Sequence, residues 1–222
     1  MLDWRWDFTF EIMPRMLWAT LNTLMAAGIG YAIAIVLGLV LALAQRTPYR
    51  PLTLVVREAV EFIRSTPLVL QIFFVFYVGP QYGVTLSPWV AGMIAIGLHY
   101  AAYLSEVYRG GIESVPKGQW EACTALNMST AQTYFRIIIP QALPLSVAGM
   151  GNYLVGIFKD TPMLSVIGVA ELMHAANAIG GQHYRYLEPY TIVGVVFLLI
   201  SLPSAGLIRA FEAWVRRKLG MS

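Results

Sequence analysis

The sequence predicts an all-α membrane protein with five transmembrane helices. Hydrophobic residues make up 58% of the 222 residues and charged residues only 12%, a composition that is too apolar for an ordinary water-soluble domain. Uncharged stretches recur that are long enough for the roughly 20 residues that a spanning helix needs. Because apolar stretches extend along most of the sequence, we expect a single transmembrane domain over residues 1–222.

The apolar stretches and the turn-forming residues between them set the expected spans. These cover residues 16–45, 53–78, 88–108, 140–160 and 189–210. Pro67 is expected to bend the second span near its middle, since proline removes a backbone hydrogen bond. Thr161 and Pro162 resemble a helix N-cap followed by a first-turn proline, so we expect a short helix from there to about His174.

Opposite charges at helical spacing predict ion pairs along two of the spans. Glu61 is four residues from Arg57 and three from Arg64, and Glu106 is three residues from Arg109. Side chains at these spacings lie on the same face of a helix and can pair. We therefore expect the first half of the second span to lie at the membrane interface or against protein rather than against lipid.

The lysines and arginines are distributed unevenly across the expected topology. All of them fall on one side of the membrane except Arg5, Arg15, Lys159 and Arg185. Cytoplasmic loops carry the excess of positive charge, so the richer side is the cytoplasm. We expect the N-terminus outside and the C-terminus in the cytoplasm, where the run Arg216–Lys218 would anchor the end of the last span.

Residues 111–139 are the longest hydrophilic interval and are predicted to form two short helices joined by a hinge. Pro116 suits the first turn of a helix, and Asn127 tolerates the left-handed backbone that ends one. Ser129 and Gln132 have the spacing of a capping box, which would start the second helix. The interval could be a solvated loop, but a small-residue face and two helix signals favour a unit that docks a cytoplasmic partner.

No motif for catalysis or for a bound cofactor is found in the sequence. There is no GxxxxGK[ST] loop, so the chain does not bind ATP in the P-loop manner. His99, His174 and His183 lack metal-ligand spacing, and the single cysteine excludes an internal disulfide. No basic cluster is interleaved with aromatic residues as a nucleic-acid surface would require. We therefore expect a non-enzyme with no metal, no cofactor and no nucleic-acid partner.

Polar residues inside the apolar spans are candidates for a translocation pathway. Gln71, His99 and Asn152 lie near the middle of the second, third and fourth spans. Polar groups are costly there and are often functional, and three on a shared inward face could line a path for a zwitterion. The alternative is that each makes an interhelical hydrogen bond that only holds the bundle together.

The hydrophilic interval carries a family resemblance. Glu121, Ala122 and Cys123, then Asn127, then the run Ile137–Pro140 are similar to the EAA signature of ABC-importer permease subunits. That signature reads EAA, three residues, glycine, nine residues, then I-x-LP. The spacing is kept, and the three departures are the mild changes of alanine to cysteine, glycine to asparagine and leucine to isoleucine.

Three further segments extend the resemblance along the chain: EFIRSTPLVLQIFF, LSEVYRGGI and FKDTPMLSVIG. Together they resemble the polar amino-acid uptake branch, and within it the permeases for ectoine and hydroxyectoine. The resemblance implies the type I ABC-importer permease fold in a bacterial inner membrane. It also implies that Lys159 and Asp160 lie at the outer end of the translocation pathway, in a gating or substrate-contact role. The alternative for these two charges is a solvated helix end.

The resemblance also implies partners and docking residues. A cytoplasmic ATPase would bind ATP, a second permease subunit, identical or paralogous, would complete the pathway, and an extracytoplasmic solute-binding protein would deliver ectoine, hydroxyectoine or a polar amino acid. The residues expected to dock the ATPase are Glu121, Ala122, Cys123, Ala125, Leu126 and Asn127. Membrane lipid would cover the rest of the transmembrane surface.

The main alternative is a stand-alone secondary transporter or channel subunit. Such a protein needs ion-coupling groups near the midplane and usually more spans or inverted repeats. The sequence shows no internal repeat and few ionisable residues within its spans. A non-transporting assembly factor is a third interpretation.

Overall fold

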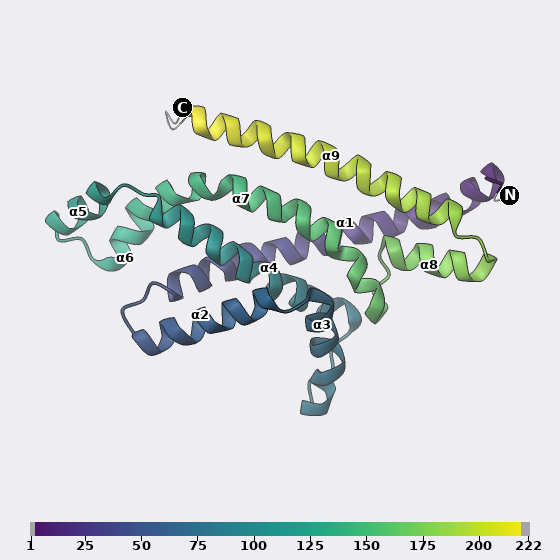
Figure 1. The fold of residues 1–222 in the computed structure, drawn as a ribbon, viewed down its shortest axis with the longest axis horizontal. Helices are drawn as coiled ribbons and strands as arrows, with labels where there is room; N and C mark the ends of the chain where they lie inside the picture. The colour runs from purple at the N-terminus through teal and green to yellow at the C-terminus, as the bar shows by residue number, and fades with distance from the viewer. Residues whose placement is uncertain (1–2, 219–222) are drawn as a thin grey trace.

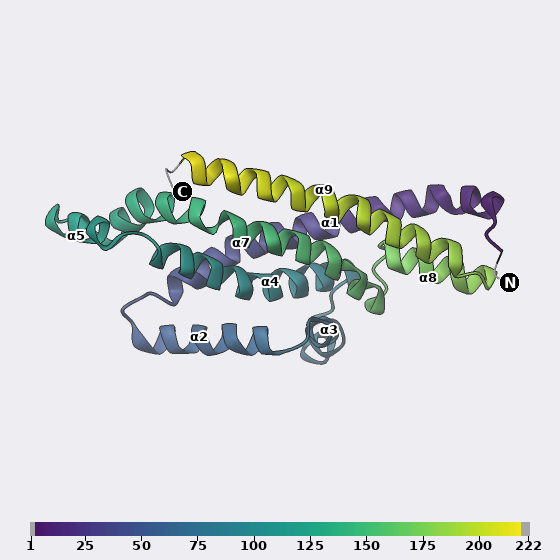
Figure 2. The same ribbon diagram turned by 45° about the horizontal axis from the view of Figure 1, so that its top comes forward.

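The computed structural model describes residues 3–218, apart from the side chains of Ala148, Arg216 and Lys218. Within that range every regular element is a helix, as the composition predicts. Four long helices run side by side along one axis (Figures 1 and 2). They are α1 (Trp6–Ala44), α4 (Pro88–Glu113), α7 (Ile139–Asp160) and α9 (Leu187–Lys218).

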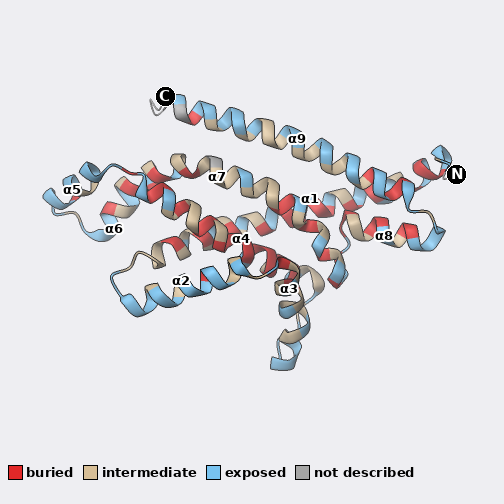
Figure 3. Cartoon of the chain, viewed as in Figure 1, coloured by how far each residue is buried: buried red, intermediate tan, exposed pale blue. Residues whose placement is uncertain are grey.

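Close packing of α1 against α4 forms the centre of the bundle. A Cβ atom on Gly97 of α4 would lie 2.5 Å from the side chain of Ile33, and one on Gly30 of α1 would lie 2.6 Å from Ile96. Small residues let two helix backbones approach in this way inside a membrane. Figure 3 shows buried residues gathered on these facing surfaces.

The helix expected over residues 53–78 is broken at Thr66 and Pro67. It divides into α2 (Arg50–Ser65) and α3 (Leu68–Phe73), and the two helical segments on either side of the break meet at 109°. Proline disfavours the helical conformation in the residue before it, and Thr66 is extended, with φ −107° and ψ 142°. The bend expected at Pro67 is therefore a sharp corner. A π-helical turn, η1 (Phe74–Val78), and a 3₁₀ turn, η2 (Gly79–Tyr82), complete the arm.

The prediction of a single short helix from Thr161 to His174 is wrong. A 3₁₀ helix, η4 (Thr161–Ile167), ends where Gly168 takes a left-handed conformation with φ +82°, and α8 (Leu172–His183) begins separately. Thr161 is not the cap, because its hydroxyl donates to the carbonyl oxygen of Phe158 at 2.8 Å. The buried Glu171 carboxylate caps α8 instead and accepts from the backbone N–H groups of Met173 and His174.

Within residues 3–218, three helices are individually long and apolar enough to cross a membrane, and two bent helix pairs raise the number to as many as five. The three are Trp6–Ala44, Pro88–Glu113 and Leu187–Val215, and the bent pairs are Arg50–Ser65 with Leu68–Tyr82 and Gly149–Ile167 with Leu172–His183. The first and last helices begin earlier than expected. Large apolar side chains such as Trp18 and Leu199 are exposed along α1 and α9, as a lipid environment requires.

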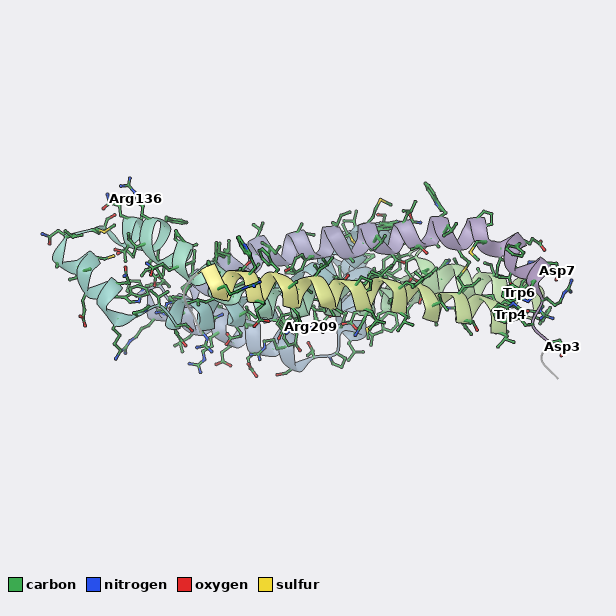
Figure 4. All side chains as sticks on the ribbon, turned by 90° about the horizontal axis from the view of Figure 1, so that it is seen from above. Asp3, Trp4, Trp6, Asp7, Arg136 and Arg209 are labelled. Atoms are coloured by element: carbon green, nitrogen blue, oxygen red, sulfur yellow. The ribbon has the colours of Figure 1, made fainter. Side chains whose placement is uncertain are left out.

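The two ends of the bundle carry different polar groups. Figure 4 shows Arg136 at the end formed by the hydrophilic interval and Trp4 and Trp6 at the opposite end. Tryptophan is enriched at membrane–water interfaces.

Within the run expected to anchor the last span, the Arg217 Nε donates to the carbonyl oxygen of Ala213 at 3.2 Å, whereas the side chains of Arg216 and Lys218 lie outside the described residues.

Candidate functional site

The predicted helix-hinge-helix is present, and we call residues 111–139 the docking segment after the role expected of it. It contains α5 (Lys117–Ala125), α6 (Thr130–Gln132) and the π-helical η3 (Thr133–Ile138), and α5 lies at one extreme end of the bundle (Figure 1). Asn127 has φ +50°, which confirms the predicted left-handed hinge. The Ser129 Oγ accepts from the Gln132 N–H at 3.3 Å, and the Gln132 Oε1 accepts from the Ser129 N–H at 3.0 Å, which confirms the capping box.

A small cluster of apolar side chains packs against α5. Its buried members are Ile112, Val115, Ile138 and Ala142. Trp120 of α5 and Tyr134 of η3 pack against this cluster with their rings in an edge-to-face contact, 5.5 Å between centroids. The docking segment is therefore packed onto the ends of α4 and α7 rather than being a free loop.

The predicted docking residues divide between surface and interior. Cys123 is buried, so the cysteine in place of the signature's second alanine contacts the protein's own interior. The Leu126 side chain is 74% exposed, although it is large and apolar. The exposed members are Glu121, Ala122, Ala125, Leu126 and Asn127. The exposed members therefore combine the apolar Leu126 side chain with the Glu121 carboxylate.

Gln71 and His99, two of the predicted pathway residues, are brought together. The Gln71 Oε1 lies 3.1 Å from the His99 Nδ1, and His99 is buried. The Gln71 Nε2 donates to the Ile63 carbonyl oxygen at 2.7 Å and to the Thr66 hydroxyl at 2.7 Å. Gln71 therefore joins the corner between α2 and α3 to the inner face of α4.

Asp160 reaches the same region from the end of α7. Its Oδ2 accepts a hydrogen bond from the Tyr100 hydroxyl at 2.7 Å. Tyr100 lies next to His99, with 5.4 Å between the ring centroids. Asn152 and Lys159 are exposed on α7, and neither side chain forms a hydrogen bond or an ion pair with the described part of the chain. The structure therefore groups Asp160 with Gln71 and His99 but leaves Asn152 and Lys159 out.

Aromatic residues that sequence reasoning missed complete this group. The Tyr153 ring of α7 lies 6.1 Å from that of Tyr100 and 5.4 Å from that of Tyr103. The Arg64 guanidinium of α2 lies over the Tyr103 ring at 5.4 Å. A signal was available, since Tyr100 and Tyr103 are within one helical turn of His99. We call this set the polar cluster: Arg64, Gln71, His99, Tyr100, Tyr103, Tyr153 and Asp160.

A second charged region lies between the polar cluster and the docking segment. The predicted pairs Glu61–Arg64 and Glu106–Arg109 form, at 3.2 Å and 2.8 Å. The pair predicted between Arg57 and Glu61 does not, because no carboxylate of residues 3–218 lies within 4.0 Å of the Arg57 guanidinium. A cavity of about 330 Å³ is lined by these groups, namely Gln45, Arg46, Thr53, Arg57, Glu61, Arg64, Glu106, Arg109 and Glu113.

Metal binding has no candidate in the part of the chain that the structure describes. No group of three or more His, Cys, Asp or Glu side chains there could hold an ion. The polar cluster contains one carboxylate, one histidine and one guanidinium, a set suited to hydrogen bonding and to cation–π contact.

The chain is similar to known transport proteins along most of its length. It is 42% identical over 205 residues to a probable amino-acid ABC transporter permease of Sinorhizobium fredii, covering 92% of this chain and 89% of that one. It is 34% identical to the L-cystine transport system permease TcyB of Bacillus subtilis, covering 94% and 93% of the two chains.

Solved structures show the same similarity. A crystal structure of an amino acid ABC transporter with histidines matches with a TM-score of 0.87 and 30% identity, covering 95% of this chain and 99% of that one. The MetNI methionine ABC transporter shares the fold, with a TM-score of 0.66 at 19% identity. Residues 34–217 match the family described as binding-protein-dependent transport system inner membrane component. The chain belongs to this family of permease subunits.

Proposed function

We propose that this chain is the permease subunit of an ABC importer for a polar amino acid. The family match over residues 34–217 carries the proposal. Relatives described as permeases for amino acids and for L-cystine, and a solved relative titled an amino acid ABC transporter, support the substrate class. The chain's own role is transport, and ATP hydrolysis belongs to a separate ATPase chain.

The docking segment is the proposed contact with that ATPase. In this arrangement α5 rests in a groove of the ATPase, with Glu121 near the middle of the helix. When ATP closes a pair of ATPases, the two docked helices move together and turn the bundles from inward-facing to outward-facing, a rigid-body transition between two packings. The apolar support under α5 favours this role, since a docked element must move with its bundle.

The assembly contains a second permease subunit, identical or paralogous, and an external solute-binding protein. The exposed apolar faces of α1 and α9 are then covered by lipid and by the second subunit. The docking segment faces the cytoplasm, the N-terminus lies outside and the C-terminus inside. The excess of basic residues on one side of the membrane supports this orientation.

The polar cluster is the proposed path for the substrate. Asp160 presents a carboxylate to an ammonium group, and the tyrosine rings beside it offer cation–π contact. Arg64 presents a guanidinium to a carboxylate: its Nη1 pairs with Glu61 at 3.2 Å, but its buried Nε has no hydrogen-bond acceptor among the described residues. Opposite charges on either side of an aromatic group match a zwitterion. Lys159, which is exposed, is proposed to act at the outer mouth of the path, and Asn152 to face the second subunit.

An amino acid and ectoine are both zwitterions, so the test must separate them. Proteoliposomes would contain this permease, its second permease subunit where one exists, and the ATPase, with the solute-binding protein outside. ATP-dependent uptake of a labelled polar amino acid that excess ectoine does not reduce supports the proposal. Uptake of ectoine instead would reassign the substrate. Uptake that needs an ion gradient and no ATP would indicate a secondary transporter and overturn the proposal.

A further inference from the structure

Arg46 lies directly beyond the C-terminal end of α1 and contacts three other elements. Its Nη1 lies 3.4 Å from the Oε1 of Glu113, the last residue of α4. Its Nε donates to the hydroxyl of Tyr134, in η3, at 3.3 Å. Its guanidinium carbon lies 5.7 Å from the centre of the Trp120 ring, in α5. One side chain therefore joins the ends of α1 and α4 to both parts of the docking segment.

The partners of Arg46 are themselves held in place. Glu113 also accepts hydrogen bonds from the Arg109 Nη1 at 2.9 Å and 3.0 Å, so its carboxylate is oriented by a second cation. Trp120 and Tyr134 touch each other. The Arg46 side chain is 27% exposed, so these contacts are partly shielded from water. Several charges in one network contribute more to holding their elements together than an isolated, fully solvated ion pair does.

The chain around α5 shows why such a connection is needed. α5 begins after Pro116, which is not helical, and ends at a hinge where Asn127 is left-handed. Two backbone joints therefore flank the helix, and either joint could bend when α5 is displaced. Side-chain contacts across the joints are the means by which α5 can move with the long helices.

We propose that Arg46 is a positioning residue that transmits the displacement of the docking segment to α1 and α4. The inference rests on the proposed function, because it assumes that an ATPase displaces α5. A planar guanidinium can meet a carboxylate, a hydroxyl and an aromatic face together, which the ammonium of lysine cannot. Without Arg46 the ATPase still binds and hydrolyses ATP, but less of the displacement of α5 is transmitted to the transmembrane helices.

The experiment measures substrate molecules transported per ATP hydrolysed in proteoliposomes that contain the complete transporter. Arg46→Met keeps an unbranched apolar stem but removes the guanidinium and its three contacts, and Arg46→Lys keeps the charge and N–H donors but not the planar guanidinium. Arg50→Met is the matched control, since the Arg50 side chain is exposed and forms no hydrogen bond or ion pair within residues 3–218. The amount of ATPase that co-purifies and the basal ATPase rate report on assembly.

We expect Arg46→Met to assemble normally and to keep its basal ATPase rate, while the transport ratio falls at least about threefold, as expected for a residue within a coupling network. Arg46→Lys should be intermediate and Arg50→Met unchanged. A wild-type ratio for Arg46→Met overturns the inference. If Arg46→Met does not assemble, the ratio of Arg46→Lys decides, and a wild-type value overturns the inference. Wild-type transport without ATP would instead defeat the proposed function.

Discussion

The Gln71 side chain takes the place of a backbone donor that Pro67 cannot supply to Ile63. In a regular helix the Ile63 carbonyl oxygen would accept from the N–H of residue 67, and proline has none. The Gln71 Nε2 donates to that oxygen at 2.7 Å, closer than the Thr66 hydroxyl at 3.2 Å and the Thr66 N–H at 3.4 Å, and the Gln71 Oε1 lies 3.1 Å from the His99 Nδ1. The Gln71 amide thus joins the corner in the second span to α4, alongside the Tyr103 hydroxyl, which donates to the Arg64 carbonyl oxygen at 3.1 Å.

This relationship predicts a structural cost for removing Gln71. Gln71→Leu should lower the free energy of unfolding by about 1–3 kcal/mol, because it leaves the buried His99 Nδ1 without its partner and removes the shortest of the hydrogen bonds to the Ile63 carbonyl oxygen. In a Pro67→Ala background, residue 67 regains an N–H, so the loss caused by Gln71→Leu should be smaller. Unfolding of the four variants in mixed micelles measures both losses. Equal losses in the two backgrounds would show that Gln71 does not substitute for the missing donor.

The Tyr100–Asp160 hydrogen bond predicts a defect in transport rather than in folding. Tyr100→Phe removes only the hydroxyl that orients the Asp160 carboxylate. Because the carboxylate loses its orientation toward the substrate, the kcat/KM of uptake should fall by about tenfold, which corresponds to about 1.4 kcal/mol. The measurement is initial uptake rate against substrate concentration in proteoliposomes. Tyr82→Phe, at an exposed tyrosine, is the control. Unchanged uptake by Tyr100→Phe would remove this pair from the path.

The exposed carboxylate of Glu121 predicts a defect in ATPase binding. Glu121→Lys reverses the charge in the middle of α5 without touching the buried cluster, so the permease should insert normally but fail to retain the ATPase. Co-purification of the ATPase on a tagged permease measures this. Glu11→Lys makes the same change at an exposed site near the other end of the bundle and should have no effect. A wild-type yield of ATPase with Glu121→Lys would argue against the docking role.

The hinge at Asn127 predicts a dependence on backbone conformation. A β-branched residue at φ +50° is strained by about 1–2 kcal/mol, so Asn127→Val should weaken ATPase binding by about five- to thirtyfold. Asn127→Gly should bind at least as tightly as the wild type, because glycine adopts this conformation freely. Titration of the ATPase measures the affinities. Met128→Val places valine one residue later, outside the left-handed region, and should be nearly neutral. Equal affinity of Asn127→Val and Met128→Val would contradict the hinge.

The proposed orientation predicts which sites an external reagent can reach. Cys123 is the only cysteine, so Cys123→Ser gives a background without thiols. In that background Tyr184→Cys, at an 89% exposed site between α8 and α9, should react with an impermeant maleimide on intact spheroplasts. Lys117→Cys, at the start of α5, should react only after the membrane is permeabilised. Labelling of Lys117→Cys in intact spheroplasts would reverse the orientation and remove the ATPase from its proposed place.

Local features of the site were predictable because they depend on neighbours in the sequence. The conformation of Asn127 and the capping box of Ser129 and Gln132 follow from residues at most three positions apart. The ion pair of Glu106 and Arg109 follows from helical spacing alone. In each case the interaction energy is available as soon as the local helix forms.

For other features the sequence predicted the type of structure but not its extent, or the prediction was wrong. Pro67 indicated a bend, but the 109° corner depends on Gln71 and on packing against α4. Thr161 is a residue type that often caps helices. However, α7 continues up to Thr161, and the Thr161 hydroxyl donates to the carbonyl oxygen of Phe158, three residues earlier in the chain. Packing of neighbouring elements overrode the local preference there.

The sequence by itself determined the helical class, the approximate positions of the apolar helices and the design of the docking segment, because composition, periodicity and capping act over a few residues. Only the tertiary structure decided that Tyr100 meets Asp160 and that Arg46 meets Glu113, across 60 and 67 positions of sequence. Such contacts arise from how whole helices pack, and the packing energy is shared among many residues. No short sequence motif encodes this packing.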